Sequence, residues 1–398
     1  MRVLFIATTF GVLVGCGPLT PLPRDGGVDA GASGGGAATG GGGSSGGGGA
    51  TGGGGATGGG AATGGGGMTG GGGATGGGGG SSAFSWVRMT FSPAPTNPAT
   101  TFTVRGLTRR ASGEVFVSLN NGELYASTAG SETLVRVPNL PAQTGSTLLG
   151  PVIAFGTDVA LVRGASVQTC SGTCTDFASF NPLQSLAFPE EGTAFCARSD
   201  GSTAYLTTNA GSTGKLWTLS RGMTLTMTET SANVGIGNVE KCQVAASGEV
   251  FIAGDSSVGV LRTSGGLATE SVDLMGQPGA SWRDVSGSFL VGGGSGYRVA
   301  TRNAGTGTWA SVAPDTSGTL FTSVAALSAN ETLVGGVLNS GNTTQAGILK
   351  WNGSRFVALT PAAPVFEVEL GVMVSENEVY FAGYERASGG YVVVHGTR

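Results

Sequence analysis

The sequence predicts an all-β fold: a seven-bladed β-propeller that is closed by an N-terminal outer strand and preceded by a disordered, Gly-rich tether. Three observations predict it. Short strands rich in β-branched and aromatic residues recur at a nearly constant spacing, an extra strand-like segment precedes the first of them, and a glycine tract separates both from the start of the chain. The propeller domain is expected to occupy residues 83–398 of this 398-residue chain.

The chain starts with a short apolar segment that carries one positive charge, Arg2. Its apolar run is too short for a transmembrane helix, which needs roughly 20 residues, so it predicts an export signal. The run ends in Leu13-Val14-Gly15-Cys16, which resembles the lipobox of bacterial lipoproteins. The resemblance implies a signal peptide over residues 1–15 and lipidation of Cys16. An ordinary secretory signal with a chance cysteine is the alternative.

A lipid on Cys16 implies that the chain is extracytoplasmic and held to a membrane by several acyl chains, which anchor far better than one chain. Residues 16–30 would form the lipidated N-terminal segment. Gly17 follows the cysteine, and the aspartate associated with inner-membrane retention in enteric bacteria is absent. We therefore expect the bacterial outer membrane or the cell surface.

The glycine tract covers residues 31–82, where 32 of 52 residues are glycine. It contains almost no apolar side chains that could offset the entropy lost on ordering, so it predicts a disordered linker. As a flexible coil it would hold its ends roughly 40 Å apart on average. The tract therefore indicates a tether between a lipid anchor and a folded domain.

The charge of the chain limits the classes of partner that it can bind. The net charge is only −4 and no run of Lys or Arg occurs, whereas nucleic acid requires a basic face, so we expect no nucleic-acid partner. No second apolar segment is long enough for a membrane helix. We expect a monomer that uses no cofactor.

The repeat after residue 83 consists of short segments such as GEVFV, EVFIA and EVYFA. The central residues of consecutive segments are 45, 44, 46, 39, 43 and 47 residues apart. A period in the forties made of strands and Gly-rich turns is typical of propeller blades with four strands each, so seven anchor residues predict seven blades. These anchors are Phe116, Leu161, Tyr205, Phe251, Leu290, Leu333 and Tyr380.

Each blade is expected to be a meander of inner, anchor, third and outer strands. The sixth repeat shows this order, with an inner segment at 324–327, a third strand at 347–351 and an outer strand at 355–359. The last repeat lacks an outer strand, and an extra strand at 85–89 precedes the first. Pairing that strand into the last blade closes the ring and removes two exposed edges, whereas an open two-domain arrangement leaves it unexplained.

Two motifs resemble those of known propeller repeats. Gly335-Gly336 and Gly292-Gly293 follow apolar strands and have a tryptophan downstream, which resembles degenerate kelch repeats. Thr301-Arg302-Asn303-Ala304-Gly305 resembles an Asp-box hairpin with Asn in place of Asp, and residues 207–211 do the same. The resemblance to kelch and Asp-box propellers implies a fold and no particular activity.

Four cysteines remain once Cys16 is assigned to the lipid, and an oxidising compartment favours two disulfides. Cys170 and Cys174 suit a small loop bridge, which leaves Cys196 and Cys242 as the second pair. When positions are counted from the anchor residues, Cys196 and Cys242 occupy equivalent positions on successive blades and point the same way round the ring, which argues against a bridge. When positions are counted from the turn glycines, one cysteine moves by one residue to the other face of its strand, which permits the bridge. A metal site is the alternative, but neither the spacing nor a nearby His supports one, so no metal is expected.

The sequence contains no convincing catalytic residue. The sole histidine, His395, lies three residues from the C-terminus, a poor platform for the general base of a Ser-His-Asp hydrolase. Glu367 and Glu369 alternate on a predicted inner strand and could serve a glycosidase, which needs two acids. A solvated strand end beside the axial channel is the alternative interpretation.

Three arginines are the candidate ligand-binding residues. Arg109, Arg198 and Arg283 each lie seven residues before an anchor, on predicted inner strands of alternate blades. Three guanidiniums near one level of the channel could bind a carboxylate or another anion through paired donors, and unrelated surface arginines are the alternative. We expect a membrane-anchored binding or scaffold module for a glycan or surface-protein ligand, with a glycan-active hydrolase or lyase as the alternative.

Overall fold

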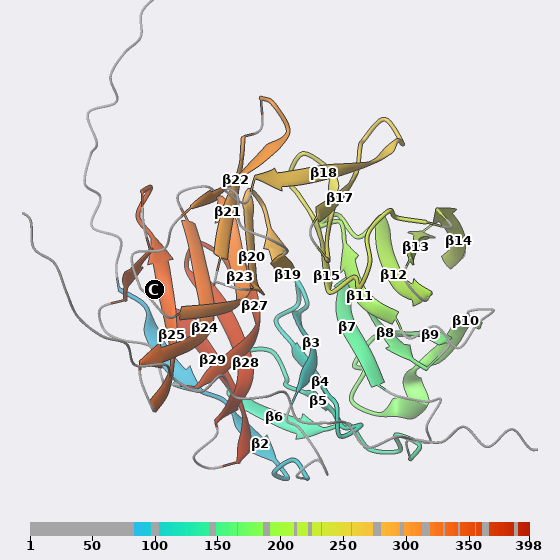
Figure 1. The fold of residues 1–398 in the computed structure, drawn as a ribbon. Helices are drawn as coiled ribbons and strands as arrows, with labels where there is room; N and C mark the ends of the chain where they lie inside the picture. Colours follow the sequence, from blue (N-terminus) through green and yellow to red (C-terminus); the bar gives the residue numbers. More distant parts are fainter. Residues whose placement is uncertain are drawn as a thin grey trace, which may run out of the picture. The chain divides into compact units, whose positions relative to one another are not determined.

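Figure 1 shows the fold in a computed structural model. All described residues belong to one compact unit, Gly77–Arg398. The signal segment, Cys16 and the glycine tract lie outside the described residues, so the predictions made for them are untested. The structure describes residues 83–96, 103–142, 149–164, 166–185, 192–210, 213–221, 225–231, 233–255, 257–273, 280–294, 298–303, 305–312, 319–328, 331–340, 343–354, 356–359, 366–385 and 389–398.

The strands form seven antiparallel meanders, one for each predicted repeat (Figure 1). The first strand of each meander contacts the first strands of the meanders before and after it, and the seventh contacts the first, so these strands form a closed inner ring. All seven anchor residues lie on second strands. The prediction of a seven-bladed β-propeller is therefore confirmed.

The first three blades are built from thirteen strands and one short 3₁₀ helix, because blade 1 has an additional strand. From the axis outward, blade 1 comprises β3 (Val104–Arg109), β4 (Val115–Leu119), β5 (Leu124–Ala126), β6 (Thr133–Arg136) and β2 (Thr90–Ser92). Blade 2 comprises β7 (Leu149–Phe155), β8 (Asp158–Arg163), β9 (Ser166–Ser171), η1 (Phe177–Ser179) and β10 (Asn181–Ser185). Blade 3 comprises β11 (Gly192–Ala197), β12 (Thr203–Ala210), β13 (Thr213–Arg221) and β14 (Leu225–Ser231).

The remaining four blades have four strands each. Blade 4 comprises β15 (Lys241–Val244), β16 (Val250–Ala253), β17 (Ser257–Leu261) and β18 (Leu267–Asp273). Blade 5 comprises β19 (Ala280–Ser286), β20 (Phe289–Gly294), β21 (Arg298–Asn303) and β22 (Thr308–Val312). Blade 6 comprises β23 (Thr319–Ser328), β24 (Glu331–Ser340), β25 (Thr343–Trp351) and β26 (Phe356–Ala358). Blade 7 comprises β27 (Glu367–Ser375), β28 (Glu378–Glu385), β29 (Gly390–Thr397) and β1 (Ser85–Arg88).

The second strands are rich in apolar residues because neighbouring blades cover both of their faces. Every residue of β4 and of β16 is buried. A strand covered on both sides reads as a continuous apolar run, which is why these segments gave the clearest repeat. The layers between blades form separate hydrophobic clusters; in one of them Phe251 of blade 4 packs with Trp282 and Trp309 of blade 5.

The ring closes through the N-terminal strand, as predicted. β1 pairs antiparallel with β29, and Trp86 lies opposite Gly396 in the register. A Cβ at Gly396 would lie 2.7 Å from the Trp86 ring, so the close approach requires glycine there. Strand β1 is thus the outer strand of a blade whose other three strands come from the far end of the chain.

Two pairings go beyond the predicted meanders. After β1 the chain continues into β2, which pairs parallel with β6 of blade 1, so the N-terminal segment joins blades 7 and 1. The outer strands β18 and β22 also pair in parallel, through Val272 with Trp309 and Asp273 with Ala310, which merges blades 4 and 5 into one eight-stranded sheet. The described part of the chain contains no helix long and apolar enough to cross a membrane.

Candidate functional site

The seven inner strands surround a cavity of about 260 Å³. Residues of β3, β7, β11, β15, β19, β23 and β27 all line it, so it lies on the axis of the ring. A concave site that all the blades share is the usual place for a ligand in such a fold. The cavity is therefore the candidate functional site.

Two cations face this cavity from opposite parts of the ring. Arg105 belongs to blade 1 and Lys241 to blade 4, three steps around a ring of seven. The Arg105 side chain is exposed and Lys241 is half-buried. Among the described residues, neither cation has a hydrogen-bond or ion-pair partner. Burial by the surrounding ring lowers the pKa of Lys241, the charges of Asp284, Glu240 and Glu369 raise it, and Arg105 lowers it further.

Asp284 is the carboxylate in the cavity wall, and its oxygens are already engaged. Ser323 Oγ and the Val324 N–H both donate to Asp284 Oδ2 at 2.9 Å, and the Val285 N–H donates to Oδ1 at 2.9 Å. Burial raises the pKa of Asp284 to about 6, although Lys241 and these donors oppose the rise. Asp284 of blade 5 thus ties itself to the inner strand of blade 6.

Glu369 performs the same role between blades 7 and 1. Its Oε2 accepts a hydrogen bond of 2.6 Å from the Val104 N–H of β3. Burial raises the pKa of Glu369 to about 7, while the Val104 N–H and the charges of Lys241 and Arg105 lower it and Glu367 raises it. Glu367 is buried and Glu369 is half-buried, so the predicted solvated strand end is correct for neither carboxylate.

One β-bulge places Arg105 at the cavity, and another places Glu369 against the Val104 N–H of the adjacent blade. The register of β3 shifts between Val104 and Gly106, and that of β27 shifts between Val368 and Leu370. Each shift leaves one extra residue, which is Arg105 in blade 1 and Glu369 in the adjacent blade 7. Bulges commonly re-aim a side chain beside a functional site. Alternation along a regular strand could not have predicted these two orientations.

The rest of the cavity wall combines apolar side chains with polar groups, and several of these polar groups pair with one another. Gln243 Nε2 donates to Ser286 Oγ at 3.0 Å, and Ser286 Oγ contacts the Ala326 backbone through its N–H and its carbonyl oxygen. Thr108 Oγ1 accepts a hydrogen bond from the Ala154 N–H at 2.9 Å. Apolar side chains from β3, β7, β11 and β27 also line the cavity. The wall therefore offers an incoming ligand apolar side chains, polar groups and two cations.

Both expected disulfides form. Cys170 and Cys174 close a small loop within blade 2, and Cys196 and Cys242 join the inner strands of blades 3 and 4, with Cα atoms 5.7 Å apart in each pair. Cys196 lies opposite the anchor Tyr205, whereas Cys242 lies opposite Ile252, one residue past the anchor of its blade. The shift obtained from the turn glycines is therefore correct, and Cys242 of the second bridge lines the cavity.

The three predicted arginines have separate partners, and none of them lines the cavity. Arg109 Nε lies 2.9 Å from Glu378 Oε1, Arg198 donates to the Gly248 carbonyl oxygen at 3.3 Å, and Arg283 Nη1 lies 2.7 Å from Glu240 Oε1. Their spacing from the anchors is equal, but the turns between inner and second strands differ in length.

The register places the three arginines at different levels. In each blade, one inner-strand residue lies directly opposite the anchor residue. Arg109 follows that residue by one position and Arg198 follows it by two, whereas Arg283 precedes it by two positions and lies in a bulge. The structure does not bring them together at one level, and their role in ligand binding stays a prediction.

His395 also lies away from the cavity. Its Nδ1 is 2.7 Å from Glu132 Oε1 and its ring stacks on Tyr380 at 4.3 Å between centroids, so it joins blade 7 to the loop before β6 of blade 1. Glu378 Oε1 is 3.5 Å from His395 Nε2. Within the described residues, no group of His, Cys, Asp and Glu side chains could hold a metal ion.

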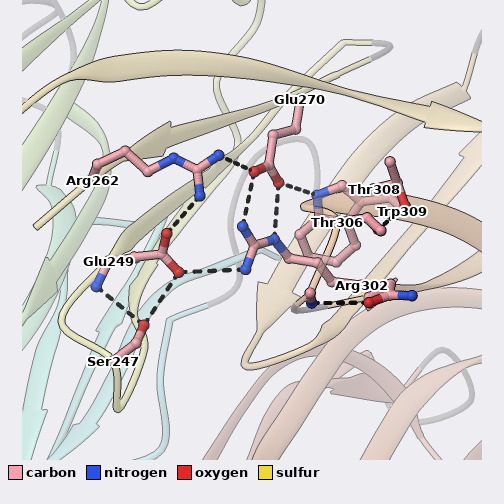
Figure 2. A network of polar contacts seen from close by, with 10 residues as sticks. Ser247, Glu249, Arg262, Glu270, Arg302, Thr306, Thr308 and Trp309 are labelled. Carbon is pink, nitrogen blue, oxygen red and sulfur yellow. Dashed lines mark hydrogen bonds and ion pairs between the residues drawn. The ribbon is translucent and has the colours of Figure 1, made fainter.

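A second charged cluster lies between the outer parts of blades 4 and 5, and Figure 2 shows it. Glu270 accepts from Arg302 Nε at 2.9 Å, from Arg302 Nη2 at 2.8 Å, from Arg262 Nη2 at 2.6 Å and from Trp309 Nε1 at 2.9 Å. Glu249 binds the same two arginines. Burial alone would raise the pKa of Glu270, but the donors and charges of Arg302, Trp309 and Arg262 lower it. In this cluster every charge has a partner.

Comparisons with known proteins support the fold. No protein-family model and no curated protein sequence matches the chain. The propeller is similar to virginiamycin B lyase from Staphylococcus aureus, with a TM-score of 0.57 at 9% identity over 79% of this chain and 99% of the lyase. It is also similar to YCF48 from Cyanidioschyzon merolae, with a TM-score of 0.56 at 10% identity over 78% of this chain and 98% of YCF48. YCF48 bound to D1 peptide gives a TM-score of 0.54 at 13% identity over 79% and 97% of the two chains. At such identities the likeness shows the fold alone: the chain is a β-propeller.

Proposed function

We propose that this chain is an extracytoplasmic lipoprotein whose propeller acts as a binding or scaffold module. The lipobox-like stretch before Cys16 supports the lipid anchor, and the composition of residues 31–82 supports a flexible arm. The proposed location is the bacterial outer membrane or the cell surface. There a monomeric ring on a long arm would contact a ligand outside the membrane, either a glycan or a surface protein.

The observation that carries the binding function is the pair of unpartnered cations in the axial cavity. Charged side chains that lack a partner at the wall of a protein cavity carry an unfavourable desolvation energy, which a ligand of opposite charge can offset. Arg105 and Lys241 both lack a hydrogen-bond or ion-pair partner within the described residues, and the half-buried Lys241 carries this desolvation energy. A ligand that enters this cavity would contact all seven blades at once.

A protein ligand has further support from the fold comparison. YCF48 is a propeller of similar fold, and it is bound to the D1 peptide in a solved structure. Apolar side chains from four inner strands line the cavity in this chain, beside its charged and polar groups. A peptide could place an apolar side chain against this part of the wall.

A hydrolase or lyase acting on a glycan is the second candidate function. In its favour, Asp284 and Glu369 have raised pKa values and lie near one cavity, which is typical of acid–base residues. Against it, both carboxylates accept hydrogen bonds from neighbouring strands. A histidine-to-alanine variant of virginiamycin B lyase is catalytically inactive, whereas the sole histidine here, His395, contacts Glu132 outside the cavity. These contacts favour the binding module.

The anchor is tested by fractionation of cells that express the full chain or its Cys16→Ser variant. We expect the wild type to take up labelled palmitate and to sediment with outer membranes, and the variant to do neither, because the thiol is the acylation site. A wild-type chain that is soluble and unlabelled would contradict the lipoprotein proposal.

Binding and catalysis are separated by one panel of peptides and oligosaccharides incubated with the full chain. We expect at least one panel member to bind and none to be converted. Turnover that Glu369→Gln or Glu367→Gln abolishes would establish the enzyme in place of the binding module. The exposed Glu376→Gln is the matched control, because Glu376 follows the same inner strand and lies outside the cavity.

A further inference from the structure

We propose that the axial cavity receives the C-terminal carboxylate of a peptide that ends in an apolar residue, with Arg105 and Lys241 as the two cations that bind it. This inference deepens the proposed binding function and rests on it. It specifies the ligand group, the two residues that recognise its charge and the wall that accepts its last side chain.

The arrangement of the two cations is the first step of the argument. They come from blades that are as far apart as a ring of seven allows, and both line one cavity. Their charges repel each other, since Arg105 contributes to lowering the pKa of Lys241. An anion placed between them would turn this repulsion into two attractions. Hydrogen bonds to a charged partner are the strong ones in proteins, and Arg offers a planar pair of donors that matches a carboxylate.

The surrounding carboxylates indicate a ligand with a single negative charge. Asp284 and Glu369 both act on Lys241 and partly balance the cations. A dianion such as phosphate would be repelled by these two groups once they ionise, whereas a monoanion would meet a smaller repulsion. Both oxygens of Asp284 and Oε2 of Glu369 already accept hydrogen bonds from neighbouring groups, and among the described residues neither carboxylate forms an ion pair with Arg105 or Lys241.

The cavity wall can accept the end of a peptide chain. Leu107, Ile153, Phe195, Leu370 and Met373 line it from four inner strands. Burying an apolar side chain against these residues is favourable. The cavity of about 260 Å³ is small for a ligand pocket, so it suits a chain end rather than a segment that passes through.

The test uses isothermal titration calorimetry on the full chain with Cys16→Ser, which removes the lipid and leaves the propeller unchanged. The probe is the tripeptide acetyl-Gly-Ala-Leu with a free carboxylate. The same tripeptide with a C-terminal amide, glucuronate and inorganic phosphate are the comparison ligands. We expect the free acid to bind at least about tenfold more tightly than each of the other three, as the loss of a charge-assisted hydrogen bond implies.

Variants of the two cations identify the site. Lys241→Met and Arg105→Leu should each weaken binding of the free acid by about tenfold or more and leave binding of the amide unchanged. Arg88→Leu is the matched control, since Arg88 lies on β1 with an exposed side chain and pairs with Glu385 away from the cavity. Circular dichroism and thermal melting confirm that each variant is folded.

Several outcomes would overturn the inference. Equal binding of acid and amide, tighter binding of glucuronate or phosphate, or unchanged affinity in Lys241→Met would each do so. If peptides or glycans bind the full chain but ignore both cations, this inference fails while the proposed binding function stands. If none of the panel binds and a substrate is turned over instead, the binding function itself fails.

Discussion

The two charged regions of this propeller use the same residue types in opposite ways. Between the outer parts of blades 4 and 5, the Glu270 carboxylate receives donors from Arg262, Arg302 and Trp309, and every charge is matched (Figure 2). At the axis, Arg105 and Lys241 have no partner among the described residues. The first arrangement joins two blades, and the second leaves charge available for something that enters the cavity.

The paired cluster is expected to stabilise the fold, whereas the two cations of the cavity are expected to serve binding. Removing one partner of a buried ion pair strongly destabilises a protein, because the other partner is left as an uncompensated charge. A cation that already lacks a partner can be removed with little loss and even with a gain. Stability measurements on matched variants therefore separate the two regions without any knowledge of the ligand.

The largest effect is expected for Glu270→Ala. The substitution leaves Arg302, whose side chain is 8% exposed, and the Trp309 N–H without their main acceptor, so the free energy of unfolding should fall by about 3 to 5 kcal/mol. Urea denaturation followed by tryptophan fluorescence measures it. Glu240→Ala removes an exposed partner of Arg283 and should lose less than about 1 kcal/mol. Equal losses in the two variants would contradict the contrast.

The next largest effect is expected when a disulfide bond is removed. The Cys196–Cys242 bridge spans 46 residues, whereas the Cys170–Cys174 bridge spans 4. Because a longer closed loop restricts the unfolded chain more, replacing the first pair by alanine should lower the free energy of unfolding by about 4 kcal/mol and replacing the second by about 2 kcal/mol. Denaturation under non-reducing conditions compares the two double variants. A greater loss from the shorter loop, or free thiols in a non-reducing digest, would be inconsistent with this account.

A smaller effect should appear as a pH dependence at Glu369. Its pKa of about 7 in the folded state exceeds the ordinary 4.5, so the folded state holds a proton that the unfolded state has released between these values. The contribution of Glu369 to the free energy of unfolding therefore falls as the pH rises from about 4.5 to 7, and it stays low at higher pH. Glu369→Gln keeps an acceptor for the Val104 N–H, and it should be more stable than wild type by about 2 kcal/mol at pH 8, with little difference at pH 4.5.

Thermal melts of wild type and Glu369→Gln across pH 4.5 to 8 give that comparison. The charges of Lys241 and Arg105 lower the pKa of Glu369, and the charge of Glu367 raises it. Variants of these three residues should therefore change the dependence of stability on pH. Glu376→Gln, at an exposed residue, is the control. A stability difference that is the same at both ends of the pH range would rule out titration of Glu369 as its cause.

The smallest effect is expected for Lys241→Met. At pH 5, below the pKa values of about 6 and 7 of Asp284 and Glu369, removing a desolvated cation without a partner should change the free energy of unfolding by less than about 1 kcal/mol, and in the stabilising direction. Urea denaturation at pH 5 is the measurement. A loss of more than about 2 kcal/mol would place Lys241 with the paired charges of the blade 4 and 5 cluster.

The arginines show which features of this chain a sequence pattern can predict and which it cannot. Strands covered on both faces must be apolar, so the anchors could be counted and the number of blades followed from them. Arg109, Arg198 and Arg283 shared a spacing from those anchors but not a level, because the turns that precede the second strands differ in length. Arg105 was missed because a bulge aims it at the cavity. The register shift between Val104 and Gly106 that produces this bulge is seen only in the structure.

The sequence by itself determined the all-β class, the seven blades, the closing strand and the Cys170–Cys174 pair. Each depends on a local pattern: an apolar run, a constant spacing, or a cysteine count. The tertiary structure alone decided the bulges, the parallel pairing of β18 with β22 and the meeting of Arg105 and Lys241 at one cavity. These depend on loop lengths and on contacts between residues far apart in the chain, and no local pattern encodes which distant side chains then face one another.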